Sequence, residues 1–452
     1  MGAMGDHRQA ADRDAHRSSK EETRGGLHRV LGLREAVALG VGGTVGGGIF
    51  VLVGVAAGLA GPGALAAFGL AFAAALVIAV PYAELSCRLP LAGGGYAFVR
   101  EVLGPHWDFL EGWGYWGAYV FVSGYVTIGF GGYLAAVTGL PVVAGAVGVV
   151  VASTALNLLG VRISGRAQAL VVLVAVVGLV TFALWGLPDV RLEHLDPFLP
   201  FGGQGVLLAA LVAFLAFGGF DMVAAAGEEV HDPERNLPRA ILITLVTVLV
   251  LYLAVTFVAL GVQPADRLGA SEAPLAVVAE AFGGPAGRGL IAFSALLTTA
   301  ATANAVLVVT SRIVFAMARD GLVPRRLGVV HPATGAPWAA VLVNGVLLAA
   351  VAAAGTVAFA AAVGGFLFVL HFVPPLAALA VLRRRRGQPR PAFTTPAPRV
   401  ALPVAFASSA ALASASGTTG ILFGVGWLAV GLVAYGVHRL LLGGVAARRR
   451  GV

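Results

Sequence analysis

Eight long windows of this sequence contain no Asp, Glu, Lys or Arg. A helix that crosses the hydrocarbon core of a membrane needs about 20 mostly apolar residues. Four windows have room for about two such helices and a turn, and they are Ala36–Ala83, Gly112–Val161, Pro332–Leu382 and Val400–Val437. Four others hold one helix each, and they are Ala167–Pro188, Pro197–Phe220, Ala240–Ala265 and Gly289–Ser311. The pattern predicts twelve transmembrane helices.

The composition supports the same class of protein. Charged residues make up 12% of the chain and hydrophobic residues 58%, whereas soluble domains contain roughly 25% charged residues. This balance excludes an ordinary globular enzyme. We therefore expect an all-α integral membrane protein.

The positions of the basic residues predict its orientation, because cytoplasmic loops retain Lys and Arg. With an inside N-terminus and twelve helices, only Arg191, Arg267 and Arg288 of the 30 basic residues fall on outer segments. We therefore expect a multi-pass protein of the cytoplasmic membrane with both termini in the cytoplasm. The same asymmetry explains the net charge of +8 without a nucleic-acid partner.

The segments outside the helices have a different composition. Residues 1–34 mix both charge signs and predict a disordered cytoplasmic tail. Residues 35–441 are expected to form the transmembrane domain, and residues 442–452 a basic cytoplasmic tail. The single cysteine, Cys87, falls at the inner end of the second helix. It predicts no disulfide-linked partner.

Two glycine clusters interrupt the apolar windows, at Gly42–Gly48 and at Gly218–Gly219. A break inside a membrane is tolerated only where protein or a water-filled cavity covers the backbone. The clusters lie five predicted helices apart, which is typical of two five-helix inverted repeats whose first helices are discontinuous. The repeats would cover about 35–188 and 204–382, and helices 11 and 12 about 400–441. A close helix-packing face at Gly43 and Gly47 is the alternative.

Four segments in this order resemble the amino acid permeases of the amino acid, polyamine and organocation superfamily. They are Gly43–Phe50, Tyr82–Trp113, Phe217–Ile241 and Thr302–Leu327. The resemblance implies ten core helices in two inverted repeats, two peripheral helices, and transport by alternating access.

The resemblance also implies a site for an amino acid. The substrate carboxylate is expected at the backbone amides of Gly46, Gly47 and Gly48. The amino group is expected at carbonyls near Thr44, Val45, Phe217, Gly218 and Gly219. Side-chain selectivity is expected from helices 3, 6, 8 and 10, with Tyr119 and Asn304 as candidates.

Other side chains are candidates for gating and coupling. Phe217 beside the second break suits a ring that closes over substrate. Asp221 suits either cation or proton handling or a structural bond to the backbone of the first helix. His371 in the tenth helix suits packing or function.

The coupling ion is left open between H+ and Na+. Many relatives carry a lysine in the fifth helix, but Ala175 stands near that position and the only lysine is Lys20. The hydroxyls of Ser294, Thr298, Thr299 and Thr302 are candidate sodium ligands, although such hydroxyls often bond their own helix. No cofactor and no resident metal are expected.

Charged residues at the inner helix ends form an expected inner charge set. Its members are Glu84, Arg88, Glu228, Glu229, Arg235 and Arg312. Glu84 and Arg88 are four residues apart, so they can pair on one helix face. The set is either an ion-pair latch that stabilises one gate state or a solvated face.

The function expected from these observations is secondary active transport of an amino acid, by ion-coupled symport. An exchanger of amino acids or amines is the nearest alternative, and a non-transporting sensor is another. The spans contain neither a His-Glu-x-x-His pair nor a Gly-x-Ser-x-Gly elbow, so we expect no enzyme.

The Gly47→Leu substitution tests the first break. We expect it to abolish uptake without loss of expression, because a side chain would fill the place of the carboxylate. Radiolabelled uptake and immunoblotting measure the two quantities. Normal uptake by Gly47→Leu would exclude a substrate site in the first helix.

Overall fold

The computed structural model describes most of the chain. The described residues are residue 29 and residues 31–91, 94–160, 165–332, 334–385 and 391–449. The predicted disordered tail therefore lies almost entirely outside them, and Leu33 and Arg34 already belong to the first helix. Of the predicted basic tail, residues 442–449 continue the last helix and residues 450–452 are outside the described part.

Helices make up the described part, and one isolated bridge joins Leu31 to Val230. The first half contains α2 (Leu33–Thr44), α3 (Gly48–Ala60), α4 (Ala64–Arg88), α5 (Gly94–Leu103), α6 (Pro105–Thr138), α7 (Val142–Leu158) and α8 (Gly165–Gly186).

The second half continues this all-helical order. It contains α9 (Gly202–Ala216), α10 (Phe220–Ala225), α11 (Pro233–Val262), α12 (Ala265–Gly269), α13 (Pro274–Arg319), α14 (Trp338–Ala354), α15 (Val357–Leu370), α16 (Val373–Arg384), α17 (Pro398–Ser414) and α18 (Gly417–Arg449). Short 3-10 turns lie at Gly61–Gly63, Leu187–Asp189, Leu192–Leu195 and Arg325–Gly328.

Eight stretches of the described chain are long and apolar enough to cross a membrane. One of them, Gly48–Arg88, contains both α3 and α4, which meet at the turn Gly61–Gly63. The apolar helices α7 and α14 are 17 residues each, slightly less than the ~20 residues of a full crossing. The structure thus confirms an all-α membrane protein with several spans.

Both glycine clusters interrupt helices. The first interruption separates Thr44, the end of α2, from Gly48, the start of α3. The second separates Ala216, the end of α9, from Phe220, the start of α10. Gly219 has a φ of 121°, a conformation that side chains disfavour, so glycine is required there.

A further interruption was not predicted from the sequence. It separates α15 from α16 at His371 and Phe372. Pro374 and Pro375 follow directly and lack the N–H groups that would bond the carbonyls of Leu370 and His371 in a continuous helix. The prolines therefore account for the interruption.

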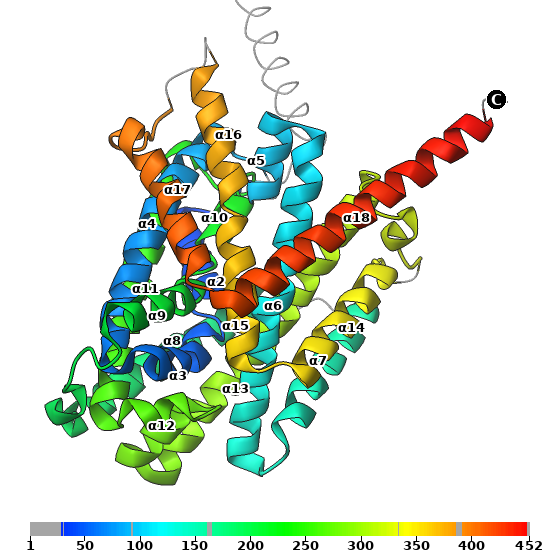
Figure 1. The fold of residues 1–452 in the computed structure, drawn as a ribbon. Helices are drawn as coiled ribbons and strands as arrows, with labels where there is room; N and C mark the ends of the chain where they lie inside the picture. Colours follow the sequence, from blue (N-terminus) through cyan, green and yellow to red (C-terminus); the bar gives the residue numbers. More distant parts are fainter. Residues whose placement is uncertain are drawn as a thin grey trace, which may run out of the picture.

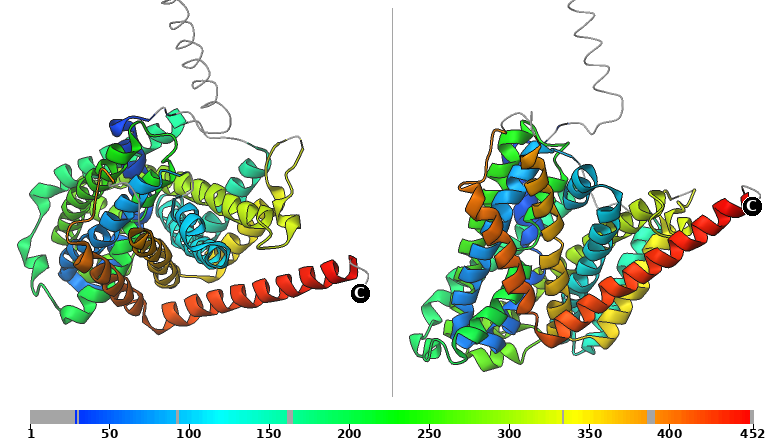
Figure 2. Two further views of the ribbon diagram at one scale, coloured as in Figure 1. Left: turned by 90° about the horizontal axis from the view of Figure 1, so that it is seen from above. Right: turned by 45° about the horizontal axis from the view of Figure 1, so that its top comes forward.

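The helices form one bundle whose ends differ (Figure 1). The short helix α5 lies at one end and α12 at the other. Tyr96 and Arg100 of α5 both bond Asp320, which follows α13. The last helix, α18, leaves the bundle and its C-terminal half projects from it in every view (Figure 2).

Candidate substrate site

The two interrupted helices lie against each other. A Cβ atom on Gly219 would be 2.5 Å from the carbonyl of Gly43 and 2.7 Å from the nitrogen of Thr44. A Cβ atom on Gly48 would be 3.2 Å from the Cα of Ala216. The glycines therefore allow backbone to approach backbone at both breaks.

Tyr252 of α11 joins the ends of the two half-helices. Its hydroxyl is 2.8 Å from the carbonyl oxygen of Thr44 and 3.0 Å from that of Ala216. One hydroxyl proton serves either carbonyl, so the second oxygen keeps accepting capacity. Tyr252 is completely buried.

The start of α3 offers backbone donors beside these acceptors. The first N–H groups of a helix have no partner within it and carry partial positive charge. The Gly47 amide donates to Thr302 Oγ1 over 3.2 Å, and Thr302 in turn donates to the Thr298 carbonyl over 2.9 Å. Opposite partial charges thus lie a few residues apart in the first break.

Close packing around Gly47 gives the Gly47→Leu substitution a second effect, on the fold itself. Even a Cβ atom there would be 2.8 Å from Thr299 Cγ2 and 3.0 Å from Val126 Cγ1. A leucine at this position must push α13 or α6 away. Thermal stability has to be measured together with uptake, so that loss of the fold is distinguished from a filled site.

The aromatic rings of the second break face different neighbours. Phe217 is fully buried, with its ring centroid 6.1 Å from Phe72 and 5.5 Å from Tyr252. The ring that approaches Gly218 is Phe368 of α15, 2.7 Å from the position of a Cβ atom. Phe217 therefore packs toward α4 and α11, and Phe368 covers the backbone of the break.

Asp221 connects the second break to α6. It is buried, and its Oδ1 accepts from the Gly219 amide over 3.1 Å. Its Oδ2 accepts from the Tyr119 hydroxyl over 3.3 Å. The structure thus brings two predicted residues, Asp221 and Tyr119, together. The partner of Asp221 is its own break and not the backbone of α2.

The candidate hydroxyl ligands of α13 bond their own helix. Ser294, Thr298 and Thr299 donate to carbonyls four residues earlier, at 3.1, 2.6 and 2.6 Å. Their oxygen lone pairs remain as acceptors. In the described part of the chain, no group of three or more His, Cys, Asp or Glu side chains could hold a metal ion.

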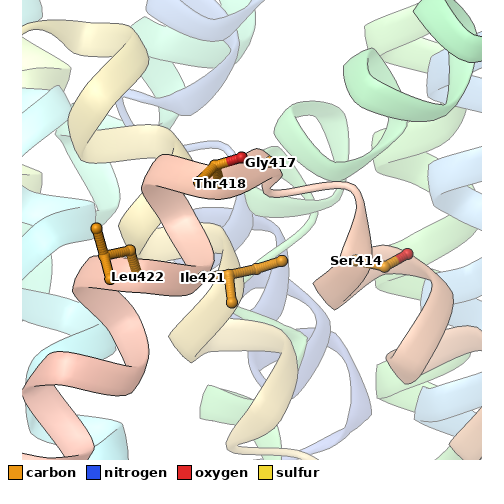
Figure 3. A pocket seen from close by; sticks show the side chains of 5 residues that line it. All are labelled: Ser414, Gly417, Thr418, Ile421 and Leu422. Atoms are coloured by element: carbon orange, nitrogen blue, oxygen red, sulfur yellow. The ribbon is translucent and has the colours of Figure 1, made fainter.

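Asn304 lies apart from the breaks. It accepts from Asn157 of α7 over 2.9 Å, and both line a cavity of about 640 Å³ with Arg312. A second pocket, of about 460 Å³, lies at the turn between α17 and α18 (Figure 3). Neither contains a residue of the two interruptions.

Glu84 is the centre of a buried ion-pair cluster at the end of α4. It pairs with Arg88 over 2.9 Å and with Arg383 of α16. Its Oε2 also accepts from the amide and the hydroxyl of Thr395, each over 2.8 Å. The cluster ties α4 to α16 and to the segment before α17.

The other members of the expected charge set lie on other elements. Glu228 and Glu229 follow α10, and the backbone carbonyl of Glu229 accepts from the Leu31 amide over 2.9 Å. Arg235 is exposed in the first turn of α11. Arg312 lines the Asn304 cavity.

Sequence reasoning missed four residues of these sites and one buried acid outside them, Glu111. The four are Tyr252, Phe368, Arg383 and Thr395. Glu111 gave a signal, since it ends a charged stretch directly before an apolar window. In the sequence, Tyr252 and Phe368 look like other aromatic residues of the apolar windows. Only their tertiary contacts distinguish them.

The fold is that of a multi-pass, all-helical membrane protein in which two interrupted helices lie against each other. The family model described as "Amino acid permease" matches residues 31–437. Because this match covers most of the chain, the protein belongs to the amino acid permease family. It is a transporter and not an enzyme.

The chain is also similar to individual proteins that are named as transporters or permeases. The chain is 32% identical over 437 residues to the methylthioribose transporter of Bacillus subtilis, covering 90% of this chain and 93% of the relative. It is 31% identical over 433 residues to the branched-chain amino acid permease BcaP of the same species, covering 90% and 92%. It is 31% identical over 351 residues to the human cationic amino acid transporter 4, covering 72% and 55%.

The Glu84→Gln substitution tests the ion-pair cluster. We expect it to lower the free energy of unfolding by about 3–5 kcal/mol, because two arginines lose a buried counter-charge. The thermal midpoint of the purified protein reports the loss. Arg88→Gln is the control, and its effect should be smaller because Arg383 and Thr395 still hold Glu84. Equal midpoints for wild type and Glu84→Gln would contradict this assignment.

Proposed function

We propose that this protein is a secondary active transporter that carries a neutral amino acid across the cytoplasmic membrane by alternating access. Twelve helices form the transporter, and helices 1–5 and 6–10 form two inverted repeats. The observation that carries the proposal is the meeting of the two interrupted helices at Gly219 and Thr44.

Helix contacts support the inverted repeats. If the two repeats are equivalent, α2/α3 correspond to α9/α10, α4 to α11, α6 to α13 and α8 to α15/α16. The contact between α2 and α11 then corresponds to the contact between α9 and α4. The contact between α8 and α13 corresponds to the contact between α15 and α6. All four contacts occur in the structure.

The direction of the half-helices supports an inversion. The Leu31 amide donates to the Glu229 carbonyl over 2.9 Å, and the His231 amide donates to the Leu31 carbonyl over 2.8 Å. The chain therefore enters α2 at the same face at which it leaves α10. The two half-helices run in opposite directions, as an inverted repeat requires.

The polar groups of the breaks suit a zwitterion. The amides of Gly46, Gly47 and Gly48 would hold the carboxylate, and the carbonyls of Thr44 and Ala216 the amino group. Thr302 would then release the Gly47 amide to the substrate. A zwitterion needs both kinds of group a few ångströms apart, and the breaks supply them from main chain.

Apolar groups around the breaks favour a neutral, apolar side chain. Val126, Thr299 and Phe368 surround Gly47 and Gly218. Asp221 is already bonded to Gly219 and Tyr119, so it is a poor counter-charge for a cationic substrate. The named activity of the branched-chain permease supports the same class, whereas that of the methylthioribose transporter makes a sugar derivative the rival substrate.

Transport itself is tested by uptake of labelled amino acids and methylthioribose into proteoliposomes. We expect accumulation of a neutral amino acid under an imposed proton or sodium gradient, because ion-coupled symport concentrates its substrate. Uptake only into vesicles preloaded with amino acid or amine would identify an exchanger. Binding without any transport would identify a sensor and contradict the proposal.

The topology is tested by cysteine labelling of intact cells. In a Cys87→Ser background, Arg267→Cys should react with a membrane-impermeant maleimide, because we assign it to the outer face. Arg399→Cys should react only after the membrane is permeabilised. Both positions are exposed on the protein. The reverse pattern, or labelling of both in intact cells, would contradict the inside location of the termini.

A further inference from the structure

A carboxylate and an imidazole form a pair in the interior of the bundle. Glu111 of α6 and His371 at the end of α15 are 2% and 3% exposed. His371 Nδ1 lies 3.3 Å from Glu111 Oε1. Neither residue belongs to the inner ion-pair cluster or to the two glycine breaks. The pair therefore has no role in the site described so far.

The pair is incompletely satisfied. Glu111 Oε2 and His371 Nε2 are buried and have no hydrogen-bond partner among the residues that the structure describes. A buried polar atom without a partner costs free energy in every state that keeps it so. A pair kept only for packing would be expected to satisfy these atoms or to be apolar. The unpartnered oxygen and nitrogen suit a pair that binds and releases a proton or a ligand.

The groups that face the pair come from every element packed on it. Asp221 of α10, Tyr82 of α4 and Tyr115 of α6 interact electrostatically with Glu111. On α5, a Cβ atom at Gly95 would be 3.2 Å from Glu111 Oε1 and equally close to Pro375 of α16.

Among the ion pairs of the described part of the chain, Glu111 takes part in one, with His371, and in none with an arginine or a lysine. An ionised Glu111 would therefore share its surroundings with the carboxylate of Asp221 and with no fixed cation.

A continuous row of side chains leads from the pair to the second break. The Tyr115 ring is 4.8 Å from His371 and 4.7 Å from Tyr119, centroid to centroid. Tyr119 bonds Asp221, and Asp221 bonds the Gly219 amide. A change at the break that moves Asp221 would thus alter the electrostatics of the pair.

The helical hydrogen-bond pattern is interrupted at His371. Pro375 cannot donate to the His371 carbonyl, and α15 and α16 meet at this point. A relative motion of the two segments would carry His371 with it. The pair thus joins α6 to the interruption between α15 and α16.

We propose that Glu111 and His371 together form a proton-binding site that couples transport to the proton gradient. This inference rests on the proposed function, because it identifies the coupling ion of the same transporter. In the loaded state the pair holds one proton more than a carboxylate beside a neutral imidazole, so its net charge is zero. In the unloaded state its net charge is −1. One proton enters from water on one side of the membrane and leaves to water on the other.

The two charge states favour different conformations. The neutral pair suits the buried geometry, because a net charge is costly away from water. The charged pair favours a conformation in which water reaches it. Proton binding and release therefore bias the transporter between a closed and an opened pathway, which is the requirement for coupling.

Proteoliposomes that contain pyranine test this proposal by reporting internal pH. The probe is the amino acid that the wild-type protein exchanges fastest, starting with leucine. Adding it outside should acidify the interior for wild type. Glu111→Gln and His371→Gln should each reduce this proton influx by at least about tenfold, and the double variant no further, because the residues act as one unit. Exchange into preloaded vesicles, which needs no net proton movement, should persist.

Matched controls address folding and position. Asp108→Asn removes another buried carboxylate of α6, three residues earlier, and should keep proton influx coupled to uptake. His194→Gln should do the same for a histidine outside the pair. If Glu111→Gln also loses exchange, Glu111→Asp decides the matter, because a shorter carboxylate should restore proton influx. Failure of Glu111→Asp to restore it would overturn the proposal.

The remaining outcomes separate the two proposals. Unchanged proton influx in Glu111→Gln and His371→Gln would overturn the proton site and leave transport intact. Sodium-driven accumulation without proton influx in wild type would do the same. Absence of both uptake and exchange in wild type would overturn the proposed function and this inference with it.

Discussion

The structure depends on how two interrupted helices satisfy their backbone inside a membrane. Lipid offers no hydrogen-bond partners, so carbonyls and amides freed by an interruption need protein or substrate. Here each break lies against the other, and Gly219 allows the contact with Gly43 because it has no side chain. Tyr252 supplies a donor to the carbonyls of both half-helices. The amides at the start of α3, of which that of Gly47 donates to Thr302, are the donors that we propose for the substrate.

Two buried carboxylates show how the surroundings decide a role. Glu84 is held by two arginines and by Thr395, which favours a fixed structure. Glu111 has one partner, His371, and an unpartnered oxygen. The first arrangement ties helix ends together, whereas the second is suited to a change of protonation. Burial alone does not distinguish the two residues.

Local sequence was sufficient for some features and not for others. The positions of the two interruptions followed from glycine clusters inside apolar windows, because no other residue tolerates the close approach. The hydroxyls of α13 were correctly suspected of bonding their own helix. The interruption at His371 was missed, although Pro374 and Pro375 follow it, because a proline pair inside a long apolar window can also begin a helix. Asn304 was placed by its helix alone, and helix assignment does not say which face a side chain occupies.

By itself, the sequence determined that the chain is an all-helical membrane protein with glycine breaks in two helices, because apolar length and glycine content act locally. Its resemblance to the amino acid permeases came from ordered local motifs for the same reason. Only the tertiary structure decided which side chains meet: Asp221 with Tyr119, Glu84 with Arg383, and Glu111 with His371. Glu111 and His371 are 260 residues apart in the chain. Contacts at such separation depend on how helices pack, and no local pattern encodes that arrangement.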